Sequence, residues 1–129
     1  MKLPSVPFAV LAVLALAAFR AWAAAPPAPA DFHLNGDAER GKAVYVRTCA
    51  LCHGVNGDAK SKMAETMKPK PIDFTDKALV DKRSDWELYL VVRDGGPAIG
   101  LSSKMLPWKA ALSDQEIRDA AAYVRSLGK

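Results

Sequence analysis

The fold is decided by the stretch Cys49-Ala50-Leu51-Cys52-His53. It has the pattern C-x-x-C-H, which is typical of covalent c-type haem attachment. The spacing suits that chemistry, because two thiols one helical turn apart can each form a thioether with one haem vinyl group. The histidine after the second thiol then lies under the porphyrin, with a ring nitrogen on the iron. We therefore predict that Cys49 and Cys52 anchor one haem c and that His53 is the proximal iron ligand.

A C-x-x-C pair has other known roles, which the rest of the chain disfavours. It can be a redox dithiol, half of a zinc site or a disulfide. A thioredoxin-like dithiol would lie in a βαβ pattern, and the sequence shows none. A zinc site needs more soft ligands, but the chain has two cysteines and two histidines. The histidine outside the C-x-x-C-H stretch, His33, lies near a Pro/Ala-rich stretch. An accidental C-x-x-C-H in an exported chain is the remaining alternative.

The N-terminus has the pattern of a secretory signal peptide. Lys2 precedes an apolar run over residues 6–19, and Ala21-Trp22-Ala23 supplies an A-x-A cleavage signal. We predict that residues 1–23 are removed and that the mature protein is periplasmic. The alternative is an uncleaved membrane anchor, although the run is shorter than the roughly 20 apolar residues of a spanning helix. Export would favour a disulfide between nearby thiols, and a pair bound to haem escapes that oxidation.

The size and charge of the chain fit a small haem-containing domain. The formal net charge is +4, and loss of the leader with Lys2 and Arg20 leaves +2. Two haem propionates would bring the molecule near neutrality, so we expect no nucleic-acid partner. A chain of about 106 residues buries a limited core by itself. A haem would add a large, flat apolar element to that core.

The local signals predict an all-α domain over residues 37–129, after an extended lead-in over residues 24–36. Asp37 can cap a helix over residues 38–47. Capping boxes at residues 84–87 and 113–116 begin two further helices, the first of them apolar nearly all round. Residues 59–67 can hold a short helix, and residues 98–109 have no helical period. The last helix has one apolar face, made by Ile117, Ala120, Ala121, Val124 and Leu127.

The haem iron has a sixth position, for which the mature chain offers Met63, Met67 and Met105. A methionine there raises the potential and makes an electron-transfer site. Met63 and Met67 are four residues apart, which is the usual spacing of two core residues on one helix face. Met105 lies in a loop stiffened by Pro107, just before a capped helix. A ligand needs a fixed position, which favours Met105, although any single methionine can simply fill a gap in a core.

Residues 37–127 resemble the class I monohaem cytochromes c. The resemblance rests on Gly41 and Tyr45 before the C-x-x-C-H-G stretch, on Lys70-Pro71-Ile72-Asp73-Phe74-Thr75, on Gly100…Met105-x-Pro107-Trp108 and on the final helix. It implies that the N- and C-terminal helices cross, with Gly41 and Tyr45 near Tyr123. It also implies that His53 and Met105 are the two axial ligands. A carbonyl that accepts the other N–H of the histidine is expected, but its residue is not assigned.

These features predict an electron-transfer protein rather than an enzyme, because an iron with both axial positions filled has no open site. Its partners would be redox proteins, such as a membrane-bound complex or a periplasmic dehydrogenase. No small-molecule substrate is implied. One alternative is a haem subunit of a larger dehydrogenase or oxidase. Another is a gas-binding cytochrome c with a weakly held sixth ligand.

Overall fold

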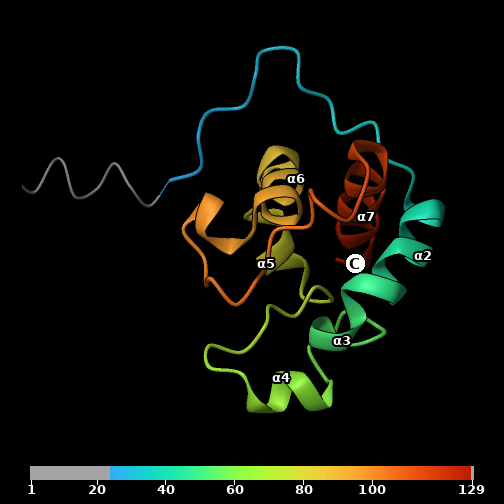
Figure 1. Ribbon diagram of the computed structural model, residues 1–129, viewed down its shortest axis with the longest axis vertical. Coiled ribbons are helices and arrows are strands. Elements are labelled where there is room, and N and C mark those ends of the chain that lie inside the picture. Colours follow the sequence, from blue (N-terminus) through green and yellow to red (C-terminus); the bar gives the residue numbers. More distant parts are fainter. Residues whose placement is uncertain (1–23, 129) are drawn as a thin grey trace, which may run out of the picture.

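The computed structural model describes residues 24–128, which fold into helices joined by loops, without strands (Figure 1). This confirms the predicted all-α fold. The predicted signal peptide, residues 1–23, lies outside the described residues. The elements are α2 (Ala38–Thr48), α3 (Ala50–His53), α4 (Lys62–Thr66), α5 (Lys77–Asp81), α6 (Asp85–Asp94), the 3-10 helix η1 (Gly96–Ile99) and α7 (Asp114–Leu127).

The longer helices begin where the capping signals predict. The carboxylate of Asp37 accepts hydrogen bonds from the backbone N–H groups of Glu39 and Arg40 at the start of α2. Both capping boxes, at Ser84 and Ser113, are complete. The sequence pattern did not predict η1, which follows directly after α6 and has a proline in its first turn. A single 3-10 turn is too short to show a period in the sequence.

Helices α2 and α7 cross in close contact (Figure 1). A Cβ atom added at Gly41 would lie 1.9 Å from the carbonyl oxygen of Asp119 and 3.0 Å from Cβ of Tyr123. The rings of Tyr45 and Tyr123 have their centroids 5.1 Å apart. The crossing that the resemblance implied is therefore present, and the glycine allows the two backbones to approach.

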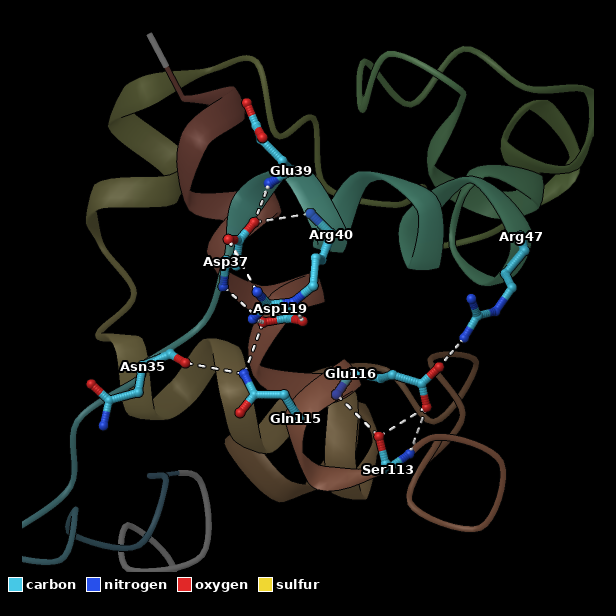
Figure 2. Close-up of polar contacts among 9 residues, drawn as sticks. All are labelled: Asn35, Asp37, Glu39, Arg40, Arg47, Ser113, Gln115, Glu116 and Asp119. Carbon is cyan, nitrogen blue, oxygen red and sulfur yellow. Dashed lines mark hydrogen bonds and ion pairs between the residues drawn. The ribbon is translucent and has the colours of Figure 1, made fainter.

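A buried carboxylate, which the sequence analysis did not single out, holds the same crossing. Asp119 of α7 is only 3% exposed. It accepts hydrogen bonds from the backbone N–H of Asp37 (2.7 Å), from Nε of Arg40 (2.8 Å) and from the amide of Gln115 (2.9 Å) (Figure 2). These donors outweigh the cost of burying the charge and join the start of α2 to the middle of α7.

Helix α6 forms the centre of the apolar core, as its sequence predicts. It contributes Leu88, Tyr89, Leu90 and Val92 as buried residues. These side chains pack against residues of α2 and α7 in two adjoining clusters. Side chains of both α6 and α7 also reach the cavity described below.

The lead-in, residues 24–36, is largely extended but is fastened to the domain. Phe32 packs edge-on against Trp86, with ring centroids 4.7 Å apart. Trp86 donates its indole N–H to the Pro26 carbonyl at 2.8 Å, and Arg118 donates to the His33 carbonyl at 2.7 Å. The part nearest α2 therefore belongs to the packed domain, because the apolar side chains of Phe32 and Leu34 join its core.

Candidate functional site

The helical domain contains an apolar cavity of about 310 Å³. This volume is within the usual range of ligand sites. Its wall includes all four residues that the sequence analysis proposed: Cys49, Cys52, His53 and Met105. Most of the remaining wall is aliphatic or aromatic, with contributions from Ile72, Phe74, Leu79, Val80, Leu88, Val91, Val92, Ile99, Leu101, Trp108, Ala121 and Val124.

The two thiols are brought together by α3. Cys49 is its N-cap, and the backbone N–H of Cys52 donates to the Cys49 carbonyl at 3.1 Å. Both are free thiols, and both line the cavity. Burial raises the pKa of the Cys49 thiol, against a smaller opposing effect of the Thr48 hydroxyl. The pair thus presents two sulfur atoms, one helical turn apart, to a single apolar space.

His53 is the last residue of α3, and its ring is held from two sides. Its Nδ1 lies 3.4 Å from the backbone carbonyl oxygen of Ile72. Because a carbonyl can only accept, this contact favours the tautomer with the proton on Nδ1 and leaves Nε2 free to bind a metal. Phe74 stacks on the imidazole with centroids 4.4 Å apart. Burial lowers the pKa of His53, which keeps the ring neutral, the form that ligates metals.

The carbonyl of Ile72 is the acceptor that the sequence analysis left unassigned. It lies in the Lys70–Thr75 stretch, which the resemblance included without giving it this role. No residue type marks a backbone carbonyl as an acceptor, so only the path of the chain could identify it.

Two hydrogen bonds fix the orientation of α3. The buried hydroxyl of Tyr45 donates to the carbonyl of Gly54 at 2.8 Å. The hydroxyl of Ser61, which caps α4, donates to the carbonyl of Cys52 at 3.1 Å. Since the last carbonyls of a short helix have no partner within it, these bonds both satisfy them and attach α3 to its neighbours.

The loop that carries Met105 is fastened to the end of α6. The backbone N–H of Gly96 donates to the Met105 carbonyl at 2.9 Å, and that of Trp108 donates to the Val92 carbonyl at 3.0 Å. Gly95 has φ +86°, and a Cβ there would lie 2.8 Å from the Met105 oxygen. The backbone of Met105 therefore has the fixed position that a ligand requires.

The other two methionines do not share a core face, contrary to their spacing. Met63 is 42% exposed and is absent from the cavity wall. Met67 follows the end of α4 in extended backbone and lines the cavity. The helix ends before it completes the predicted face, so the four-residue spacing no longer places the two side chains together. Met105 and Met67 are thus the thioethers at the cavity.

Cationic side chains complete the cavity wall: Lys70, Arg83 and Lys104. Arg83 also forms an ion pair with Glu87, at 3.1 Å. An apolar space with two thiols, a neutral imidazole, two thioethers and a few cations suits a flat apolar macrocycle that carries two carboxylates. The residues present therefore fit a covalently bound haem.

The comparison with known proteins agrees with this geometry. The family described as cytochrome c matches residues 38–128. The chain belongs to the cytochrome c family. The match begins at the first residue of α2 and ends just after α7, so it covers the whole helical domain. It confirms the predicted class I monohaem resemblance.

Similar proteins include both small cytochromes and parts of larger subunits. Cytochrome c-554(547) of Halothiobacillus neapolitanus is 31% identical over an alignment of 97 residues, which covers 71% of this chain and 98% of that protein. The cbb3-type cytochrome c oxidase subunit FixPc of Rhizobium leguminosarum bv. viciae is 36% identical over 93 residues, 72% of this chain but 29% of that subunit. The solved structure of the KustC0563 c-type cytochrome is 26% identical, with a TM-score of 0.56, over 69% of this chain and 98% of that one.

Membership of this family establishes that the domain transfers electrons and binds haem c, with its iron, covalently. The domain is a redox carrier whose partners are other redox proteins. No helix within residues 24–128 has the length and apolar character needed to cross a bilayer.

Proposed function

We propose that this cytochrome is an exported carrier of single electrons with one haem, bound to Cys49 and Cys52 and ligated by His53 and Met105. The observation that carries the proposal is the convergence of these four residues on one apolar cavity. They come from α3 and from a loop more than fifty residues later in the chain. Bound there, the haem supplies an iron that cycles between Fe(II) and Fe(III).

Each protein group has a definite task in this proposal. The Ile72 carbonyl and the Phe74 ring orient His53 and leave Nε2 of the neutral imidazole free to ligate the iron. The thioether of Met105 favours the reduced iron and raises the potential. The apolar wall excludes water from the iron. If His53 and Met105 filled both axial positions of the iron, no open site for a substrate would remain there.

Arg83 and Lys70 are the residues that we assign to the haem carboxylates. Both line a cavity whose wall is otherwise mainly apolar. A haem propionate that is buried away from water needs a cation or hydrogen-bond donors beside its carboxylate. Arg83 uses one nitrogen for Glu87, and its fork of donors can bind a second carboxylate as well.

A free carrier is the form that we favour. The similarity to cytochrome c-554(547) extends over 98% of that protein, so such a domain is nearly the whole of a small cytochrome. The alternative is a haem subunit of a larger complex, which is supported by the similarity to the oxidase subunit FixPc. We further propose that residues 1–23 direct export to the periplasm and are removed there.

The test is the visible spectrum of the purified protein in both oxidation states, with covalent attachment measured first. The haem should remain on the chain through acidified acetone and a denaturing gel. The ferric form should be low-spin and should show the weak sulfur-to-iron band near the red end of the spectrum. Ready binding of CO by the ferrous form, without that band, would instead support the gas-binding alternative.

A further inference from the structure

One wall of the cavity is weakly held. Met67, Pro69, Lys70 and Pro71 all line the cavity, and residues 68–70 are exposed on their other side. Neither proline has a backbone N–H to donate. Within the described part of the chain, residues 68–71 take part in a single hydrogen bond, in which the Lys68 carbonyl accepts from Nζ of Lys104.

The loop on the other side of that bond is well held. The backbone N–H of Met105 donates to the Ser102 carbonyl at 3.1 Å, and that of Lys104 donates to the Ser102 hydroxyl at 3.2 Å. The Met105 carbonyl is bonded to Gly96, next to α6. In Figure 1 the loop after α4 and the loop before α7 approach each other on the side away from α2. Lys104 therefore joins a weakly held wall to a fixed one.

We propose that Lys104 is a positioning residue whose ammonium group holds residues 67–71 closed against the Met105 loop. The closed wall keeps water and foreign ligands away from the iron and so protects the bond to Met105. This inference rests on the proposed haem site with Met105 as a ligand. A foreign ligand can bind only when this wall is open. Its apparent affinity is therefore proportional to the fraction of the protein in the open form.

The experiment measures the binding of imidazole, a neutral ligand, to the ferric holoprotein. Lys104→Gln removes the long donor, whereas Lys104→Arg keeps a cation that can donate to a carbonyl. Lys109→Gln is the matched control, because Lys109 is a cation on the same loop that pairs with Asp94 at 3.0 Å instead of bonding to residues 67–71. Each variant is first checked for the red sulfur-to-iron band.

Lys104→Gln should bind imidazole about three- to tenfold more tightly than wild type, the factor expected from one intramolecular hydrogen bond in a two-state equilibrium. Lys104→Arg and Lys109→Gln should be indistinguishable from wild type. The proposal is overturned if Lys104→Gln binds like wild type, if Lys109→Gln tightens binding equally, or if Lys104→Arg behaves like Lys104→Gln. A wild-type protein that lacks the red band would instead show that the Met105 ligation itself is wrong.

Discussion

Gly41 of α2 lies directly against the backbone of α7, where a Cβ atom would come within 1.9 Å of the Asp119 carbonyl oxygen. The contact sets how closely the two helices cross. It also shapes the haem site, because Cys49 follows the end of α2, and Ala121 and Val124 of α7 line the cavity. The stability of this crossing should therefore depend on the absence of a side chain at residue 41.

In Gly41→Ala the added methyl group must displace backbone rather than a flexible side chain, which should cost about 1–3 kcal/mol of stability. Alanine gains about 1 kcal/mol over glycine in a helix, so the holoprotein should be destabilised by up to about 2 kcal/mol in total. Urea unfolding measures the change. Lys42→Ala, at the next and exposed position, should stay within about 0.5 kcal/mol of wild type. Equal stability of Gly41→Ala and wild type would contradict the close crossing.

Asp119→Asn should destabilise the protein by about 1–3 kcal/mol at pH 7, because the buried acceptor of Arg40, Asp37 and Gln115 loses its charge. Arg40 remains partly in water, which limits the loss. Urea unfolding again measures it. Glu39→Gln, an exposed acid in the first turn of α2, should change little. An Asp119→Asn variant as stable as wild type would show that the donors are satisfied equally well by an amide.

The same carboxylate predicts a pH dependence. Burial alone would raise the pKa of Asp119, but the hydrogen bonds from Arg40, Asp37 and Gln115 outweigh it and hold the pKa below its usual value. A group with a lowered folded-state pKa stabilises the fold above its unfolded pKa, about 3.9, and the benefit disappears as pH falls through the folded-state pKa. The stability difference between wild type and Asp119→Asn should therefore be full near pH 6 and shrink below about pH 4. A stability difference that grows on acidification would show that folding raises the pKa of Asp119 instead of lowering it.

Met105→Ala should abolish the sulfur-to-iron band, lower the midpoint potential and open the iron to added ligands. Met67→Ala is the sharpest control, since Met67 also lines the cavity, and it should keep the band. Met63→Ala should keep it too, because Met63 is exposed. Loss of the band in Met67→Ala alone would assign the sixth position to Met67.

Cations at the cavity should steer anionic reactants, although net charge is small. Lys68 is exposed and directly precedes Pro69 of the cavity wall, whereas Lys109 is paired with Asp94. Oxidation of the ferrous protein by ferricyanide should slow as ionic strength rises, because the Debye length falls from about 30 Å at 0.01 M to about 8 Å at 0.15 M. Lys68→Glu should slow the reaction at low salt more than Lys109→Glu does. Stopped-flow rates that do not change with ionic strength would exclude electrostatic steering.

The sequence by itself determined the features that depend on near neighbours. Ser84 and Ser113 begin their helices through bonds to a glutamate three residues later, so the pattern and the structure coincide. The C-x-x-C-H stretch likewise places its thiols and imidazole through one helical turn. The all-α class followed from the same local periods. That His53 and Met105 bind the iron stays a prediction, which the cavity supports.

Only the tertiary structure decided the contacts between residues far apart in the chain. The carbonyl of Ile72 meets His53, the carboxylate of Asp119 meets the start of α2, and the ammonium of Lys104 meets the Lys68 carbonyl. Each depends on the path of a loop rich in proline or glycine, or on how closely two helices cross. Such paths have no periodic signal, because backbone carbonyls are the same in every residue and a side chain finds its distant partner only after the core has packed.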